Sequence, residues 1–416
     1  MKKRFFLAVA LFILAVGIVA CGRKGGNDES DMKLENMKPT KETAFEVEGG
    51  VLISFKDNVV KDKKIVIPES INGEVITKIA DGAFFENENI EGILIPDSIT
   101  EIGEQAFANC ENLSEVILSS NLISLPMSVF YGTAIEGVVI PESVQSIGEY
   151  AFADCHSLKE ISIPSSVKSI DSSSFMDTYN LTSINVAEEN LNFSSENGVL
   201  FNKEKTNLIK YPANKEDSSY IVPSGVKEVS SSAFLGSKNL KTINLSDVEN
   251  VGSITFLDSE NLEEVIFGSD FAEPYDGFPY LFRGCNKIKR IEIAEENEVF
   301  STVDGAVYNK DKTELIYFPQ VMENVIVNIP VGVEKIANAA FIEHEELRGV
   351  VFSDTVKVIG RGAFEGCINL KNVVVPDNVE TVETRAFLDV PRMAVKLPDS
   401  IKNVEEIFVD VLPDDE

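Results

Sequence analysis

The stretch that decides the fold is residues 140–163, which read IPESVQSIGEYAFADCHSLKEISI. Its apolar residues and its glycine follow the order I-P-x-x-V-x-x-I-G-x-x-A-F-x-x-C-x-x-L-x-x-I-x-I. The same order returns about 23 residues before and after this stretch, so the stretch is one copy of an internal repeat. A period in this range indicates a solenoid or another repeat array rather than a domain with one compact core.

The phenylalanine of the A-F pair marks the phase of the repeat along the chain. These markers are Phe84, Phe107, Phe130, Phe152, Phe175, Phe234, Phe256, Phe282, Phe341, Phe364 and Phe387. Successive markers lie 22, 23 or 26 residues apart, except for two gaps of 59 residues. Because each unit of a solenoid contacts only its neighbours, equivalent side chains stack into ladders. We therefore expect a mostly β solenoid of stacked parallel strands joined by short turns.

Each unit contains one strand and two changes of direction. The L-x-x-I-x-I segment alternates apolar and other residues, which predicts a strand with one buried face. A proline follows several of these strands, as at Pro164, and ends the ladder because it has no N–H to donate. The glycine after V-x-x-I, as at Gly103, Gly148 and Gly360, is expected at a tight bend or in a positive-φ conformation.

The composition fits a folded, strongly acidic protein. The chain has 416 residues, 44% of them hydrophobic, which is enough to bury a large core. With 37 Lys and Arg against 68 Asp and Glu, the formal net charge is −31. Such a charge repels phosphate backbones, so we do not expect nucleic acid as a partner.

The N-terminus has the composition of a secretory leader. Three cationic residues precede an uncharged run from Phe5 to Ala20, and Cys21 follows. The run resembles a bacterial lipoprotein signal, which implies cleavage before Cys21 and a diacylglycerol on its sulfur. We therefore expect a signal peptide at 1–20 and a flexible tether at 21–43. A plain membrane anchor, or an ordinary signal peptide with an incidental cysteine, remains an alternative.

The ends of the repeat array differ from its middle. Residues 44–64 predict an N-terminal β-hairpin cap with Asp57 and Asn58 in or near its turn, because a solenoid end otherwise exposes apolar core. The solenoid itself is expected at 65–405. Residues 406–416 are expected to form a C-terminal end with a solvated acidic tail.

Two long units, with insertions near 188–222 and 295–330, account for the gaps of 59 residues. Residues 193–212 and 300–319 share the pattern F-S-x-x-[ND]-G-x-[LV]-[FY]-N-K-[DE]-K-T-x-L-I-x-[YF]-P. Two apolar runs flank the polar N-K-[DE]-K-T segment, which predicts a hairpin in each unit. The hairpins could extend the sheet, or they could protrude and contact a ligand.

The repeat resembles that of the bacterial BspA-like leucine-rich-repeat family of surface lipoproteins. Residues 140–158 match the class pattern position for position, and the resemblance covers about residues 65–405. It implies a leucine-rich-repeat solenoid. It also implies a surface-exposed protein that binds host matrix proteins, other cells or unidentified ligands.

Four cysteines, Cys110, Cys155, Cys285 and Cys367, each lie three residues after a marker phenylalanine. Cys110 and Cys155 occupy coils two apart, roughly 10 Å by strand spacing. Because a disulfide needs Cα atoms within about 7 Å, we predict four buried free thiols.

Candidate binding residues come from the strands and from one irregular loop. The last x of L-x-x-I-x-I points outward, and six of these positions are apolar: Leu94, Ile117, Val139, Ile266, Val351 and Val374. Such a stripe can mark an interaction surface, although Val and Ile also favour exposed strands in general. Flanking glutamates such as Glu91 and Glu136 would suit a cationic or amphipathic partner. The loop at 270–280 adds Tyr275, Phe278 and Tyr280 as candidates.

No catalytic motif is present in the sequence. His156 and His344 have no metal-ligand spacing, and no G-x-S-x-G, Walker or dinucleotide-binding pattern occurs. We expect no enzyme activity, cofactor or metal. The favoured function is a lipid-anchored surface protein of the cell envelope that binds a protein or glycan partner. The alternative is a structural or assembly scaffold of the bacterial envelope.

Overall fold

The computed structural model describes residues 33–274, 276–321 and 325–408. The expected signal peptide, the expected lipidation site Cys21 and the loop residue Tyr275 therefore lie outside the described residues. The chain divides into two units, 1–37 and 38–416. In the first, Leu34–Asn36 form the 3₁₀ turn η2. Among the described residues, no helix has the length and apolarity needed to cross a membrane.

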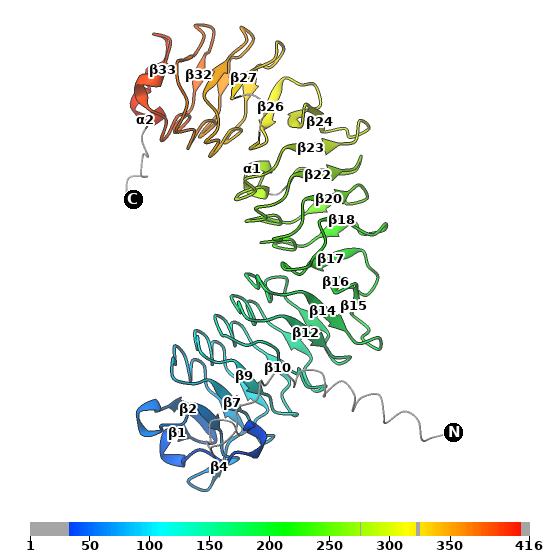
Figure 1. Cartoon of the computed structure of the whole chain (residues 1–416), viewed down its shortest axis with the longest axis vertical. Helices are drawn as coiled ribbons and strands as arrows, with labels where there is room; N and C mark the ends of the chain where they lie inside the picture. Colours follow the sequence, from blue (N-terminus) through cyan, green and yellow to red (C-terminus); the bar gives the residue numbers. More distant parts are fainter. Residues whose placement is uncertain (1–32, 275, 322–324, 409–416) are drawn as a thin grey trace, which may run out of the picture. The chain divides into compact units, whose positions relative to one another are not determined.

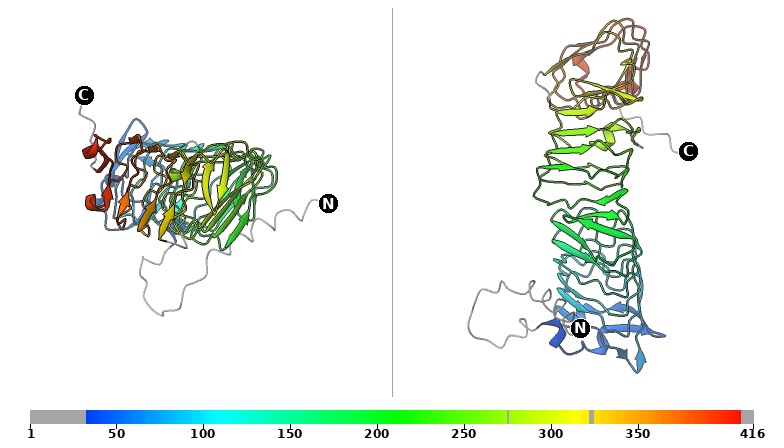
Figure 2. Two further views of the ribbon diagram at one scale, coloured as in Figure 1. Left: turned by 90° about the horizontal axis from the view of Figure 1, so that it is seen from above. Right: turned by 90° about the vertical axis from the view of Figure 1, so that its right-hand side faces the viewer.

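The second unit is the expected solenoid, in which successive coils stack two columns of strands (Figure 1, Figure 2). The first column, here called the strand face, carries the L-x-x-I-x-I segments. Its strands are β3 (Lys64–Val66), β7 (Gly92–Leu94), β9 (Glu115–Ile117), β12 (Glu160–Ile163), β14 (Ser183–Val186), β18 (Ser219–Ile221), β20 (Thr242–Leu245), β22 (Glu264–Phe267), β23 (Arg290–Ile293), β27 (Ile326–Asn328), β29 (Gly349–Val351), β31 (Val373–Val374) and β33 (Val395–Lys396). Neighbouring strands of this column pair in parallel, for example β7 with β9.

The second column consists of two-residue strands from the V-x-x-I segments. They are β6 (Lys78–Ile79), β8 (Glu101–Ile102), β10 (Ser124–Leu125), β11 (Ser146–Ile147), β13 (Ser169–Ile170), β19 (Glu228–Val229), β21 (Asn250–Val251), β28 (Lys335–Ile336), β30 (Val358–Ile359) and β32 (Thr381–Val382). They also pair in parallel along the stack, as β10, β11 and β13 do.

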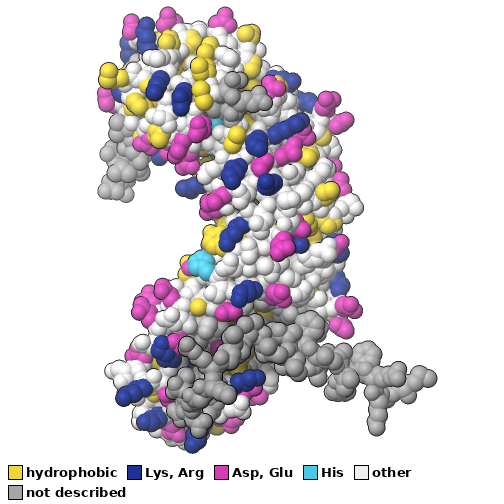
Figure 3. All heavy atoms as spheres, in the orientation of Figure 1, with side chains coloured by type: hydrophobic (Ala, Val, Ile, Leu, Met, Phe, Trp, Pro, Cys, Tyr) yellow, Lys and Arg dark blue, Asp and Glu magenta, His cyan; other side chains and the backbone are white. Residues whose placement is uncertain are grey.

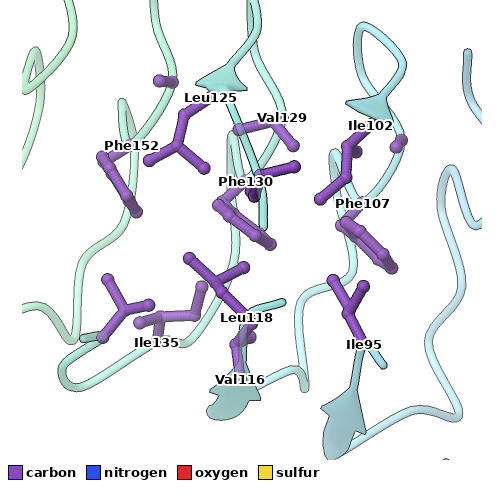
Figure 4. Close-up of a cluster of buried hydrophobic side chains, with 14 of the residues drawn as sticks. Ile95, Ile102, Phe107, Val116, Leu118, Leu125, Val129, Phe130, Ile135 and Phe152 are labelled. Atoms are coloured by element: carbon purple, nitrogen blue, oxygen red, sulfur yellow. The ribbon is translucent and has the colours of Figure 1, made fainter. Parts of the chain in front are cut away.

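The marker phenylalanines fill the space between the two columns. In Figure 4, Phe130 lies between Leu125 of the second column and Leu118, which follows a strand of the first. From Phe55 to Phe175, successive rings stack with centroids 4.9 to 5.9 Å apart. Offset stacking at this spacing is favourable for aromatic rings beyond the burial of their area.

The turn around each marker uses left-handed backbone at fixed positions. In the coil of Phe152, Tyr150 has φ 54° and Asp154 has φ 59°, two residues before and two after the marker. Equivalent residues in most other coils also have positive φ, which is a conformation that Gly, Asn and Asp adopt at the lowest cost.

Glycine is required in the I-G pair for a different reason from the one expected. Gly103, Gly148 and Gly360 do not have positive φ, so the positive-φ alternative is wrong. A Cβ at Gly103 would instead lie 2.3 Å from the backbone nitrogen of Asp81 in the preceding coil. These glycines are required because the backbones of neighbouring coils approach too closely for a side chain.

The N-terminal cap is a hairpin of β1 (Phe45–Glu48) and β2 (Val51–Phe55), followed by the small hairpin of β4 (Ser70–Ile71) and β5 (Glu74–Val75). The turn of the first hairpin lies at Gly49 and Gly50, with φ 58° and 77°, and not at Asp57 and Asn58. The latter two belong to the 3₁₀ helix η4 (Asp57–Val59). Two adjacent glycines adopt the positive φ values of the turn at no steric cost, so the turn forms at this pair.

The cap begins earlier than expected. The Thr40 backbone N–H donates to the carbonyl oxygen of Val66 at 2.9 Å. The Thr40 hydroxyl accepts from the Val66 N–H at 3.0 Å. Residues 38–43, expected in the flexible tether, therefore belong to the folded cap, and the 3₁₀ helix η3 (Glu42–Ala44) leads into β1.

Each long unit is a three-stranded meander rather than a single hairpin. The first contains β15 (Phe193–Glu196), β16 (Val199–Asn202) and β17 (Asn207–Lys210), and the second contains β24 (Phe300–Val303), β25 (Ala306–Asn309) and β26 (Glu314–Tyr317). The predicted N-K-[DE]-K-T turn is the second turn of each meander. The first turn is Asn-Gly in one meander and Asp-Gly in the other, with positive φ at both residues. Such a dipeptide is a strong hairpin signal, and the prediction of a single hairpin did not use it.

The meanders extend the sheets of the second column and divide the interior. Strand β17 pairs in parallel with β19, and β26 pairs in parallel with β28. The strand face has no equivalent pairing between β14 and β18 or between β23 and β27 among the described residues. The buried apolar residues accordingly form three clusters, which span 44–209, 199–317 and 306–407.

The last coil ends in helix α2 (Val404–Phe408), after the 3₁₀ helix η5 (Arg392–Ala394). Phe408 stacks on the last marker, Phe387, at 6.0 Å, and the Phe387 N–H donates to the carbonyl of Ile407 at 3.0 Å. Residues 406–408, expected in the C-terminal end, therefore close the solenoid core. A short helix, α1 (Phe278–Leu281), precedes the marker Phe282.

Candidate functional site

The six apolar positions expected to point outward differ widely in exposure. Val139, Val351 and Val374 are 83%, 54% and 58% exposed. Leu94, Ile117 and Ile266 are half-buried. The strands alternate between buried and accessible residues, as in β22, so these side chains do lie on the outer side of the strand face.

The structure brings only some of the six together. Leu94 and Ile117 are register partners. Ile266 lies between Asn244 and Glu292 and has no apolar register partner. The stripe is therefore interrupted.

Val351 and Val374 come from the adjacent strands β29 and β31, which contact each other. A third exposed side chain, Ile326, lies in β27, which pairs with β29, and is 53% exposed. We call Ile326, Val351 and Val374 the strand-face patch. Ile326 was not among the expected residues because it occupies the first position of its strand, where most coils have a polar residue or glycine.

An edge column of mostly charged residues runs beside the strand face. It consists of the residue that follows the repeat leucine or isoleucine in each coil. In most coils this column pairs opposite charges, with Glu136 and Lys159 at 2.9 Å and Glu263 and Lys289 at 2.7 Å. Lys63 and Glu91 make a similar pair at 2.5 Å. The carboxylates expected to attract a cationic partner are therefore largely neutralised by neighbouring coils.

Beside the strand-face patch, the edge column carries like charges in place of opposite ones. Arg348 and Lys371 occupy the column in consecutive coils, since the Lys371 N–H donates to the Arg348 carbonyl at 2.9 Å. Both side chains are exposed, and neither makes an ion pair with a described residue. Lys396 is the register partner of Val374 and is also exposed. In the view of Figure 3, basic and hydrophobic side chains lie next to one another over the coils of β27 to β33.

The irregular loop places its aromatic residues differently from the expectation. Phe278 is only 1% exposed and packs edge-on against Phe300 at 5.2 Å. The expectation that Phe278 contacts a partner is therefore wrong, because α1 turns this side chain into the core. Tyr280, on the same short helix, is 53% exposed and lines a cavity of about 180 Å³.

The four cysteines are free and buried, as predicted. Each thiol donates to the carbonyl of the marker phenylalanine one coil earlier, for example Cys110 to Phe84 at 3.0 Å. Burial raises the pKa of the Cys110 thiol to about 12 and that of Cys155 to about 11. Thiols held protonated in this way are poor nucleophiles and metal ligands.

His344 occupies the same slot as the cysteines and is fully buried. Its Nε2 donates to the Pro319 carbonyl at 2.6 Å, and its Nδ1 has no partner among the described residues. Burial lowers the pKa of His344 to about 4. Among the described residues, no group of three His, Cys, Asp or Glu side chains is placed to hold a metal ion.

Comparison with known families and structures gives a consistent result. The model of the BspA type leucine rich repeat region matches residues 77–204, 213–329 and 334–409, with six copies. The first gap between these segments, at 205–212, overlaps the end of the first meander, and the second, at 330–333, follows the second meander. No curated protein matches the sequence.

Two solved structures illustrate the likeness. A leucine-rich repeat protein from Eubacterium ventriosum is 25% identical, with a TM-score of 0.62, and the match covers 86% of this chain and 94% of that one. A leucine rich cell surface protein from Faecalibacterium prausnitzii is 21% identical, with a TM-score of 0.46 and coverage of 79% and 92%.

Proposed function

The chain belongs to the BspA-type leucine-rich-repeat family, and we propose that it is a non-enzymatic, lipid-anchored protein of the bacterial cell envelope that binds a protein partner on its strand face. The repeated core supplies a rigid scaffold, and the outward side chains vary from coil to coil. Proteins of this architecture present extended surfaces on which such variable positions can contact a partner.

The observation that carries this proposal is a pair of adjacent cations beside the strand-face patch, Arg348 and Lys371, neither of which makes an ion pair with a described residue. Like charges in register on neighbouring strands destabilise a sheet, and most coils avoid this by pairing Lys with Glu. Arg348 and Lys371 break that rule next to three apolar side chains that are more than half exposed. A partner with acidic groups around an apolar contact would neutralise the cations and cover the apolar area.

A protein fits this surface better than a glycan. The patch offers branched aliphatic side chains on a flat strand surface, which suit the apolar core of a protein interface. A sugar needs several directed hydrogen bonds, and Val351 and Val374 offer none from their side chains. The basic edge also selects among protein partners, since an acidic surface would be attracted while a basic one would be repelled.

The proposed location rests on the N-terminal sequence. The cationic start, the uncharged run to Ala20 and Cys21 have the order of a lipoprotein signal. Acyl chains on Cys21 would contribute roughly 0.8 kcal/mol per buried methylene, so two or three chains anchor a protein stably. Residues 22–37 would then act as the spacer between membrane and solenoid.

The experiment is a binding screen with the full chain in mild detergent against immobilised extracellular-matrix proteins, cell-wall glycans and a second sample of the chain itself. We expect a protein ligand whose binding weakens as salt is raised from low to high concentration, because the cation pair contributes electrostatic attraction. Binding to glycans alone would contradict the proposal. Binding only between copies of the chain would favour the envelope-scaffold alternative.

A further inference from the structure

The two ends of the solenoid are covered to different extents. At the N-terminal end, the hairpin of β1 and β2 continues the second column, since β2 pairs in parallel with β6. Thr40 covers the strand face there, through its two hydrogen bonds with Val66 of β3. At the C-terminal end, the Asn403 amide donates to the Val382 carbonyl of β32 at 2.9 Å, so the segment that leads into α2 covers the second column. The strand face ends at β33, which pairs with β31 and with no other described strand (Figure 1).

The outer edge of β33 has backbone groups without partners. In the preceding coil, Val375 lies directly before a proline and donates its N–H to the Lys396 carbonyl at 3.0 Å. The residue before the proline makes the same bond to the next coil after β3, β7, β18 and β27. Leu397 holds this position in the last coil, and its N–H donates to no described residue. Because the backbone groups of Lys396 face β31 and neighbouring residues of a strand alternate, the Val395 carbonyl faces the outer edge too, and no described residue donates to it.

The inward side chains of β33 are also incompletely covered. Val373 and Val375, one coil earlier, are 1% and 3% exposed. Val395 and Leu397 hold the same positions in the last coil and are only half-buried. One further strand with apolar side chains at the two matching positions would cover them, as the next coil does elsewhere. The edge therefore lacks a strand both in its hydrogen bonds and in its apolar packing.

The charge at this edge selects the kind of strand that fits. Lys396 lies between Val395 and Leu397, is exposed on the outer side of the strand face, and makes no ion pair with a described residue. Side chains in register on adjacent strands are close enough for opposite charges to attract and for like charges to repel. Two copies of β33 paired in register would place lysine against lysine, which disfavours a second copy of the chain as the occupant. An added strand with a carboxylate at this register position is favoured instead.

We propose that the β33 edge binds an extended segment of a partner protein, in which an acidic residue stands between two apolar ones. The segment adds to the strand face as one more parallel strand. The carbonyl of its acidic residue accepts from the Leu397 N–H, the N–H of that residue donates to the Val395 carbonyl, and its carboxylate faces the Lys396 ammonium. In strand addition of this kind, main-chain hydrogen bonds supply affinity and alternate side chains supply specificity.

The chain itself shows that such a segment fits the strand face. Ile291, Glu292 and Ile293 of β23 have the proposed order, with both isoleucines buried and the glutamate on the outer side. Strand β23 pairs in parallel with β22 over its whole length. A partner segment of the same pattern would pair with β33 in the same way. The site uses the end of the ladder and not the strand-face patch, so it goes beyond the proposed function and does not rest on it.

Fluorescence anisotropy of labelled peptides with the full chain tests the site. The probe is the peptide TTSIEIPSS, with fluorescein at its N-terminus and an amide at its C-terminus. Two comparison peptides replace its glutamate by lysine or by N-methylglutamate, which lacks the N–H for the Val395 carbonyl. We expect saturable binding of the probe and severalfold weaker binding of both comparison peptides. In Lys396→Glu the order of the glutamate and lysine peptides should reverse, whereas in the control Lys61→Glu, at an exposed lysine of the cap, it should stay the same.

Hydrogen exchange followed by mass spectrometry identifies what occupies the edge. Fragments that contain Leu397 should exchange fast in the free chain and more slowly with the probe. Slow exchange in the free chain would show that the chain's own residues cover the edge, and protection that appears only at high chain concentration would show that a second copy does. Either result, absence of probe binding, or equal affinities of the three peptides would overturn the inference. Ile326→Ser/Val351→Ser should still bind the probe, so failure of the strand-face proposal is distinguished from failure of this one, and circular dichroism melting shows that each variant is folded.

Discussion

The Cys155 thiol donates a hydrogen bond to the carbonyl oxygen of Phe130, one coil earlier, at 3.1 Å. Cys285 and Cys367 make the same bond to Phe256 and Phe341, each at 3.0 Å. The slot three residues after the marker thus links successive coils, because its side chain adds a second hydrogen bond to a carbonyl that already accepts a backbone N–H within its own turn. Ser259, in the same slot, makes the equivalent bond to Phe234 at 2.9 Å.

This arrangement predicts that the four repeat cysteines are unreactive in the folded protein. Burial raises the pKa of Cys155 to about 11, so little thiolate exists near pH 8. We expect iodoacetamide to leave all four unlabelled under native conditions and to label all four after denaturation without reductant. Mass spectrometry of the cysteine peptides measures this. A disulfide-linked pair among them, or rapid labelling of the native protein, would contradict it.

The close approach at the I-G pair predicts a position-dependent cost of alanine. Gly103→Ala should lower the free energy of unfolding by ~1–3 kcal/mol, because its Cβ would collide with the backbone of Asp81. Gly137→Ala is the matched control, since no atom lies within 4 Å of a Cβ there. Urea unfolding followed by circular dichroism compares the two. Equal stability of both variants would refute the packing reason given for this glycine.

The burial of His344 predicts that the folded protein loses stability in acid. In the folded chain its pKa is about 4, whereas its ordinary value is 6.5, because burial disfavours the charged imidazolium. Between these two values the unfolded state binds more protons, so the His344 contribution is fully present above pH 6.5 and is lost as pH falls to 4. The shift corresponds to ~3 kcal/mol at about 1.4 kcal/mol per pKa unit.

The measurement is the thermal midpoint between pH 7 and pH 4. His344→Asn should flatten the decrease relative to the parent, because asparagine, which the same slot holds at Asn87, does not titrate. His156→Asn, at an exposed histidine, should follow the parent. A parallel decrease in all three proteins would show that carboxylates alone cause the acid sensitivity.

The proposed anchor predicts a change in processing when Cys21 is replaced. Cys21→Ser should abolish incorporation of radiolabelled palmitate and should retain the uncleaved N-terminal segment, because the sulfur is the acceptor of the lipid. Membrane fractionation and mass spectrometry of the N-terminal peptide follow both effects. Cys110→Ser, at a buried cysteine of the repeat, is the control and should be processed as the parent is. Unchanged lipid labelling in Cys21→Ser would refute the anchor.

The repeat pattern was sufficient to predict the solenoid, the free cysteines and the outward side of the strands, because these depend on local periodicity that each coil repeats. The two meanders were predicted only in part. The Asn197-Gly198 turn is visible in the sequence, and with it the third strand could have been predicted.

The candidate sites required the structure for a different reason. Whether Phe278 enters the core depends on the direction of α1, which no repeat position specifies. The like charges of Arg348 and Lys371 can be read from the sequence once the edge column is known. Their significance depends on the ion pairs of the other coils, and these are tertiary contacts.

The most direct test of the central claim is the affinity of the full chain for the protein ligand found in the binding screen, measured by biolayer interferometry. Two variants remove the proposed site, Val351→Ser/Val374→Ser and Arg348→Ala/Lys371→Ala. Two controls change exposed residues elsewhere, Leu191→Ser/Val331→Ser and Lys61→Ala/Arg361→Ala. The account predicts that each site variant weakens binding by about tenfold or more, or ~1.4 kcal/mol, while both controls stay within about twofold. Site variants that bind as tightly as the controls would contradict it.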